Sequence, residues 1–210
     1  MARSAAAEVA AASAGGGTTR VTPRERAAPR ERVARPERVA PQERAAPRDG
    51  QRGKVYEAEN LVHRIFDRSV DYPVVEIAGS RLTLPPERRF GSIDSVQDYV
   101  DKVLALNWVR TTWVRAGVPV RVRERAGSTQ AHYERAGAIM AVPGHRSGSG
   151  WALRELVILH EMAHHLAEGP EPAHGGPFLD RLLTMVDGVV GAEAALLLRI
   201  TLLDCGVRIG

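Results

Sequence analysis

The 210-residue chain is poor in cysteine and aromatic residues and has no long apolar run. Its one cysteine, Cys205, cannot form a disulfide within the chain, so the sequence does not require an oxidising compartment and we expect a cytoplasmic protein. No stretch approaches the roughly 18 consecutive apolar residues that a membrane-spanning helix needs. These absences predict a soluble protein that does not act at a membrane.

Positive charge and aromatic residues lie in different parts of the chain. Residues 1–49 hold ten arginines and six acidic residues, whereas residues 50–210 hold 19 basic and 19 acidic residues. All ten Trp, Tyr and Phe residues lie between Tyr56 and Phe178. The net charge of +4 therefore belongs to the first 49 residues. The remainder is formally neutral, which argues against a nucleic-acid-binding domain.

The first 49 residues have the composition of a disordered tail. From Pro23 a six-residue unit repeats as PRERAA, PRERVA, RPERVA and PQERAA. Proline in every unit blocks a continuous helix, and no large apolar side chain is available to bury. We therefore predict a disordered tail over residues 1–49 and a single folded domain over residues 50–210. The arginines could contact an acidic or nucleic partner, but a glutamate in every unit favours a solvated extension without a specific role.

The first half of the domain predicts helices and strands. Apolar residues at helical spacing predict a helix over residues 52–67, and residues 73–78 and 81–85 predict a hairpin with its turn at Gly79-Ser80. Ser92 can cap a second helix. Two further strands are predicted. The first is indicated by the alternation of Val118, Val120 and Val122, and the second covers residues 132–142.

The second half is helical throughout. Apolar periodicity predicts a helix from Trp151 that Gly169-Pro170 ends, followed by helices over residues 177–189 and 192–203. Helices and strands that alternate and then give way to three helices predict an α+β domain rather than a doubly wound parallel sheet.

The helix that begins near Trp151 contains an HExxH motif, His160-Glu161-Met162-Ala163-His164. Four residues advance a helix by about 400°, so His160 and His164 project from one face and can bind one Zn²⁺. Glu161 lies one position round the helix, where its carboxylate can act as general base toward a water bound to the metal. This spacing predicts a zinc hydrolase.

A catalytic zinc site normally has three protein ligands, so the third must come from elsewhere. The metzincin pattern is excluded because it requires glycine and histidine where this chain has Ala167 and Pro170. We favour His174, since the glycines and prolines around it let the chain turn back toward the metal. The carboxylates that remain as alternatives are Glu193, Asp180 and Asp187.

The motif and the following His174-Gly175-Gly176-Pro177-Phe178 resemble the HExxH…HGxxF arrangement of SprT-like zinc metalloproteases, the group that includes Spartan. The resemblance implies a zincin-like domain with a small antiparallel or mixed sheet packed on the HExxH helix. It also implies that His160, His164 and His174 bind Zn²⁺ and that Glu161 is the general base. The chain lacks the zinc-ribbon cysteines and DNA-binding segments that some SprT-like proteins carry.

Residues 48–210 also resemble a family of actinobacterial metallohydrolases with no assigned substrate. The strings that carry this resemblance are Arg48-Asp49, Gln51-Arg52, Lys54-Val55-Tyr56 with Ala58-Glu59, Arg154-Glu155-Leu156-Val157 and Gly206-Val207-Arg208-Ile209-Gly210. The repetitive tail lies outside the resemblance.

Other polar residues are weaker candidates for the site. His132 or Tyr133 could donate to an oxyanion from a strand beside the metal, although packing in the sheet is the more common role. His165 points about 100° away from His164, which favours a packing or orienting role. His145 lies in a Gly-Ser loop from which it could cover the site.

Two functions are compatible with these patterns. The first is a zinc-dependent hydrolase that acts through a metal-bound water and Glu161. We favour a peptidase, with a protein or peptide as its substrate. The second is a non-catalytic, zinc-stabilised binding domain whose Arg-rich tail contacts an acidic or nucleic partner. The glutamate of the motif favours the hydrolase, because a structural zinc site does not need an acid beside the water position.

Overall fold

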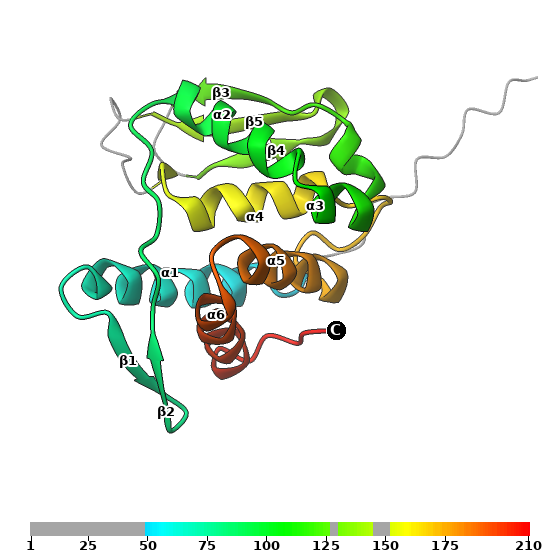
Figure 1. Ribbon diagram of the computed structural model, residues 1–210. Helices are drawn as coiled ribbons and strands as arrows, with labels where there is room; N and C mark the ends of the chain where they lie inside the picture. The colour runs from blue at the N-terminus through cyan, green and yellow to red at the C-terminus, as the bar shows by residue number, and fades with distance from the viewer. Residues whose placement is uncertain (1–48, 127–129, 145–151) are drawn as a thin grey trace, which may run out of the picture. The chain divides into compact units, whose positions relative to one another are not determined.

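The computed structural model describes residues 49–126, 130–144 and 152–210, which form an α+β domain (Figure 1). The predicted tail therefore lies outside the described residues except for Asp49, and so do His145 and Trp151. No helix in these ranges combines the length and the apolar content that crossing a bilayer requires.

The domain begins with helix α1 (Arg52–Ser69), which confirms the predicted helix and buries the expected apolar face. Strands β1 (Val74–Ile77) and β2 (Ser80–Thr83) form the predicted antiparallel hairpin. Its turn lies one residue earlier than expected, at Ala78 and Gly79, because Ile77 pairs with Ser80. Both turn residues have positive φ, 49° and 77°, as a two-residue type I′ turn requires.

Helix α2 (Ile93–Leu104) begins where its capping residue predicts. The Ser92 hydroxyl accepts a hydrogen bond from the Ser95 backbone N–H, and the Ser95 hydroxyl accepts one from the Ser92 N–H. The short helix α3 (Asn107–Thr112) was not predicted. It buries only Val109, which is too little periodicity for a sequence pattern to show.

A three-stranded sheet follows, with β3 (Arg121–Arg125), β4 (His132–Glu134) and β5 (Ile139–Pro143) in the order β3-β5-β4. Strand β5 is parallel to β3 and antiparallel to β4, so the sheet is mixed. The prediction of a single strand over residues 132–142 is wrong, because a 3-10 turn at Arg135–Gly137 reverses the chain. Strand β3 also starts later than predicted, since the Val118 N–H still bonds to the Arg115 carbonyl oxygen at the end of the 3-10 helix Val114–Gly117.

Helix α4 (Glu155–His165) lies between this sheet and helices α1 and α5 (Gly176–Val189), as Figure 1 shows. Every residue of α4 except His164 is buried. It begins later than predicted, because Leu153 and Glu155 pair through their backbones with Phe90 and Arg88. Helix α6 (Ala192–Asp204) packs against α1 and α5 and completes the core. The central position of α4 decides where the HExxH side chains lie.

Candidate metal centre

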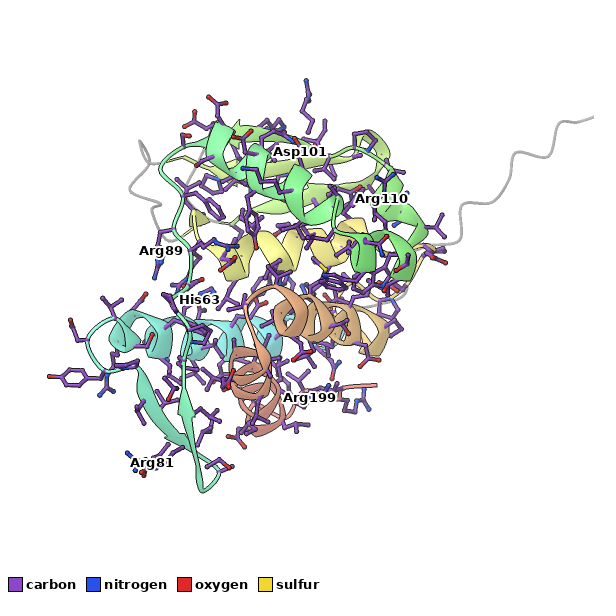
Figure 2. All side chains as sticks on the ribbon, in the orientation of Figure 1. His63, Arg81, Arg89, Asp101, Arg110 and Arg199 are labelled. Carbon is purple, nitrogen blue, oxygen red and sulfur yellow. The ribbon has the colours of Figure 1, made fainter. Side chains whose placement is uncertain are left out.

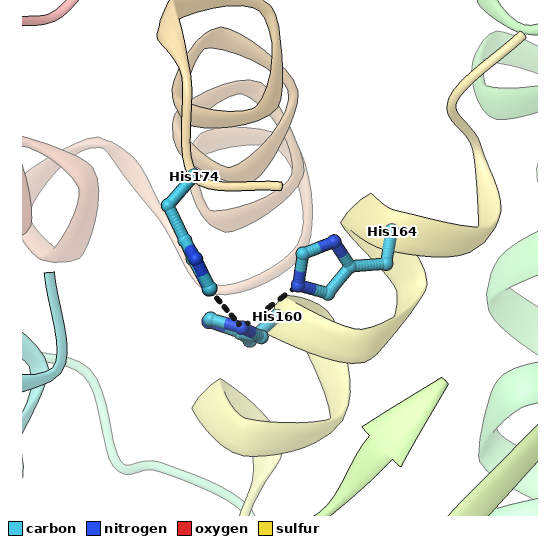
Figure 3. A group of neighbouring side chains, drawn as sticks. All are labelled: His160, His164 and His174. Atoms are coloured by element: carbon cyan, nitrogen blue, oxygen red, sulfur yellow. Dashed lines mark hydrogen bonds between the residues drawn. The ribbon is translucent and has the colours of Figure 1, made fainter. Parts of the chain in front are cut away.

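Three histidines converge beside the C-terminal half of α4 (Figure 3). His160 and His164 project from successive turns of the helix, and His174 comes from the segment just before α5. The Nε2 atom of His160 lies 3.1 Å from that of His164 and 3.3 Å from that of His174. In the described part of the chain this is the one group of three potential ligands whose donor atoms all lie within 4.8 Å of one another.

The carboxylates that the sequence left as alternatives do not join this group. Glu193 is exposed in the first turn of α6, and Asp180 and Asp187 are exposed on α5. Among the four alternatives, the fold brings only His174 to the two histidines of the motif.

Two carboxylates from the start of the domain orient the histidine rings. Glu59 Oε1 lies 2.6 Å from His160 Nδ1, and Asp49 Oδ2 lies 2.5 Å from His174 Nδ1. A carboxylate accepts hydrogen bonds, so each Nδ1 carries a proton and each Nε2 is the ring nitrogen that faces the cluster. Carboxylates that hold a metal-ligating imidazole in this way are common around zinc sites. Asp49 thus belongs to the site, although the sequence analysis assigned it to the tail.

The donor set suits a soft to borderline divalent cation such as Zn²⁺. Nitrogen lone pairs that point at one another repel unless a proton or a cation lies between them. Burial lowers the pKa of His164 to about 2, helped by the charges of His160 and His174, so this ring is neutral and ready to bind a metal. Burial also disfavours charge on His160, but Glu59 outweighs it and raises the His160 pKa. A cation would therefore displace a proton from His160.

The Glu161 carboxylate is 96% buried and lies beside the cluster. Burial raises the pKa of Glu161 to about 7, the charge of His160 opposes that rise, and the Tyr133 backbone N–H donates a hydrogen bond to the carboxylate. A carboxyl group that titrates near neutrality can both accept and return a proton at physiological pH.

The cluster opens onto a cavity of about 730 Å³. Glu161, His164 and His174 lie in its wall, together with His132 and Tyr133 from the edge strand β4. A smaller cavity of about 280 Å³ adjoins Glu161 and is partly apolar, with Ala131, Leu156 and Val157 in its wall. Glu161 borders both spaces.

His165 has a structural role. It is fully buried, and its Nε2 lies 3.0 Å from the Arg115 carbonyl oxygen, which can only accept a hydrogen bond. Burial lowers the pKa of His165 to about 4, so the ring is neutral and carries its proton on Nε2. Nδ1 must then accept the hydroxyl proton of Tyr133, 2.8 Å away.

The two candidates for an oxyanion donor are placed differently. The Tyr133 hydroxyl donates its hydrogen bond to His165 and accepts one from Arg115, 3.0 Å away, so these contacts do not support an oxyanion-donor role. His132 Nε2 lies 3.0 Å from Glu134 and borders the cavity, and its role stays a prediction.

Sequence reasoning did not assign roles to the side chains that pack on the histidines. The Tyr56 ring stacks on His160 at a centroid distance of 5.6 Å, and the Phe178 ring stacks on His164 at 4.3 Å. A sequence signal for Tyr56 and Glu59 was present, since both flank the buried stripe of α1 that contains Val55.

Comparisons of the chain with protein-family models, curated proteins and solved structures return no match.

Proposed function

We propose that this protein is a zinc-dependent hydrolase, that its substrate is a peptide, and that Glu161 is its general base. The observation that carries the proposal is the convergence of three histidine Nε2 atoms beside the Glu161 carboxylate, in the wall of a cavity of about 730 Å³. His160, His164 and His174 would hold the metal. A bound zinc ion supplies a Lewis acid that lowers the pKa of water and polarises a carbonyl group.

The chain itself supplies proton transfer and orientation. The Glu161 carboxylate accepts a proton from the attacking water and delivers it to the leaving amine. The Tyr133 backbone N–H holds this carboxylate in place. Glu59 and Asp49 fix the rings of His160 and His174, so their Nε2 atoms lie near that of His164 without further rearrangement.

The edge strand supports a peptide as substrate. Strand β4 is at one edge of the β3-β5-β4 sheet, and His132 and Tyr133 of this strand border the cavity. An extended peptide can bind along a sheet edge through main-chain hydrogen bonds. Such an arrangement would place a substrate amide beside Glu161.

The alternative function, a non-catalytic zinc-stabilised binding domain, finds less support. A structural zinc site is normally closed by four protein ligands. Within residues 49–126, 130–144 and 152–210, three ligands converge, a buried glutamate lies next to them, and the site borders a cavity. These are features of a site that admits a substrate.

The substitution Glu161→Gln tests the proposal because it keeps the side-chain shape and removes the proton acceptor. We expect zinc content, measured by atomic spectroscopy, to stay at the wild-type level, and peptide hydrolysis to fall by about 10² to 10⁴-fold. Hydrolysis is measured by mass spectrometry on a denatured-protein library with and without chelator. Glu168→Gln, at an exposed position beyond α4, should leave both unchanged. Wild-type turnover by Glu161→Gln would overturn the mechanism.

A further inference from the structure

The charged side chains in the wall of the larger cavity differ in how they are neutralised. Two carboxylates of the cavity wall already have a partner of opposite charge or a hydrogen-bond donor, since Asp49 pairs with His174 and Glu171 pairs with Arg181. Among the arginines, Arg135 donates hydrogen bonds to backbone carbonyl groups just beyond the C-terminus of α4, at 2.8 and 3.1 Å. This sorting leaves two arginines of the cavity wall to be explained.

These two arginines, Arg52 and Arg125, converge on one residue. Arg52 Nη2 donates to Gln130 Oε1 at 2.9 Å, and Arg125 Nη1 donates to the Gln130 backbone oxygen at 2.6 Å. Within the described ranges neither arginine forms an ion pair with a carboxylate. Each guanidinium has five N–H donors, so most of them remain available to a ligand. Gln130 holds the two charges together against their mutual repulsion.

The pair lies close to the metal centre. The Arg52 guanidinium stacks over the Tyr56 ring at 5.5 Å, and that ring in turn stacks on His160. Arg52 and Arg125 also border the same cavity as Glu161 and His164. A substrate whose amide bond lies beside Glu161 would therefore extend past two unpaired positive charges.

We propose that Arg52 and Arg125 form a specificity subsite that selects peptides with an acidic side chain close to the scissile bond. The inference rests on the proposed function and names its substrate class. Arginine presents N–H groups in a planar fork that matches a carboxylate, so two adjacent guanidiniums recognise it better than an amide of the same shape. Gln130 orients both forks before the substrate arrives.

The distribution of charge favours an acidic peptide over a nucleic acid. A nucleic acid chain is recognised through many phosphates by an extended positive surface. Residues 50–210 carry equal numbers of basic and acidic residues, 19 of each. In the cavity wall, the arginines without a carboxylate partner among the described residues are Arg52, Arg125 and Arg135, and of these Arg52 and Arg125 are held together by Gln130. So small a group of charges fits one carboxylate rather than a run of phosphates.

The first test compares two peptides that differ only in glutamate or glutamine at each position around one cleavage site. With full-length, zinc-loaded protein we expect kcat/KM to favour glutamate about tenfold or more at one position, mainly through KM, and the preference to shrink as salt is added. In the double variant Arg52→Gln/Arg125→Gln the ratio should approach one. Arg110→Gln, at an exposed position of α3 (Figure 2) outside the cavity wall, should keep the wild-type ratio.

A binding measurement separates failure of this inference from failure of the proposed function. Fluorescence anisotropy with zinc-loaded Glu161→Gln protein gives Kd for the same labelled peptides, and we expect about tenfold tighter binding of the glutamate peptide. Cleavage without preference for an acidic residue would overturn the subsite and leave the hydrolase intact. Arginine-dependent binding without any cleavage would support the subsite and overturn the hydrolase. Equal competition by a single-stranded oligonucleotide would overturn the acidic-peptide assignment.

Discussion

Buried polar groups have different partners at the N-terminal end of helix α4 and in its C-terminal half. At its N-terminal end, Arg154 and Glu87 are each 97% buried and bind each other with N–O distances of 2.5 and 2.9 Å. The neighbouring Glu155 accepts hydrogen bonds from Tyr99 at 2.8 Å and from Arg88 at 3.0 Å. In this region each buried charged side chain forms an ion pair with a side chain of opposite charge.

One to three turns further along, two like groups of α4 face each other instead of an opposite charge. The Nε2 atoms of His160 and His164 lie 3.1 Å apart, and the buried Glu161 accepts a hydrogen bond from a backbone N–H group. Two ring nitrogens at this distance repel unless a proton or a cation lies between them, so the arrangement suits a site that binds a cation. The comparison distinguishes the Arg154–Glu87 ion pair, here called the clamp, which stabilises the fold, from a site that is arranged to bind a cation.

The largest effect on stability is expected at the clamp. Arg154→Met would leave the buried Glu87 with only Arg89, 3.6 Å away, and the Leu156 N–H, and we expect it to lower the free energy of unfolding by about 3 kcal/mol, measured by urea denaturation. The double variant Arg154→Met/Glu87→Leu should recover most of this loss, since it removes both charges. A cost below about 1 kcal/mol for the single variant would show that the pair is not a clamp.

At the site, the largest expected effect is the loss of a ligand. His174→Ala should weaken zinc binding by about 100-fold or more, since it removes one of three converging nitrogen donors. The measurement is a competition titration with a chromophoric chelator, and Glu193→Ala is the matched control. If Glu193→Ala weakened binding and His174→Ala did not, the metal would belong to another set of residues.

A smaller loss is expected when an orienting carboxylate is changed and the ligand is kept. Glu59→Gln or Asp49→Asn should weaken zinc binding by about 10- to 100-fold, because the imidazole loses basicity and its fixed tautomer. Glu57→Gln, on the exposed face of α1, should have no effect in the same titration. Unchanged affinity in all three variants would contradict the orienting role.

The smallest effect concerns His63 on α1 (Figure 2), whose carbonyl oxygen accepts a hydrogen bond from Arg154 and which borders the smaller cavity together with His160. Burial and the nearby Arg154 lower the pKa of His63 to about 4 in the folded protein, against 6.5 ordinarily. The neutral ring therefore favours the fold above pH 6.5, and this contribution is lost as the pH falls toward 4. We expect the loss of stability between pH 8 and pH 5 to be about 1 kcal/mol smaller in His63→Gln. Urea denaturation at both pH values would show no difference if the ring were solvated.

The elements that sequence patterns located correctly depend on contacts between near neighbours. Helical spacing placed α1, α2, α5 and α6, and the Ser92 cap located the start of α2. The errors occurred where distant contacts decided the backbone. Strands β4 and β5 were predicted as one because their apolar pattern continues through the turn at Arg135–Gly137, and α4 starts late because residues 153–155 pair with the segment before α2.

The sequence by itself determined that His160 and His164 lie on one face of a helix, with Glu161 beside them, because an α-helix fixes the relation between residues four apart. Only the tertiary structure decided which residue joins them and which carboxylates orient them. Glu59 and Asp49 lie 101 and 125 residues before their histidines. No local periodicity relates residues so far apart, and the packing of α1 and the segment before α5 around α4 brings them together.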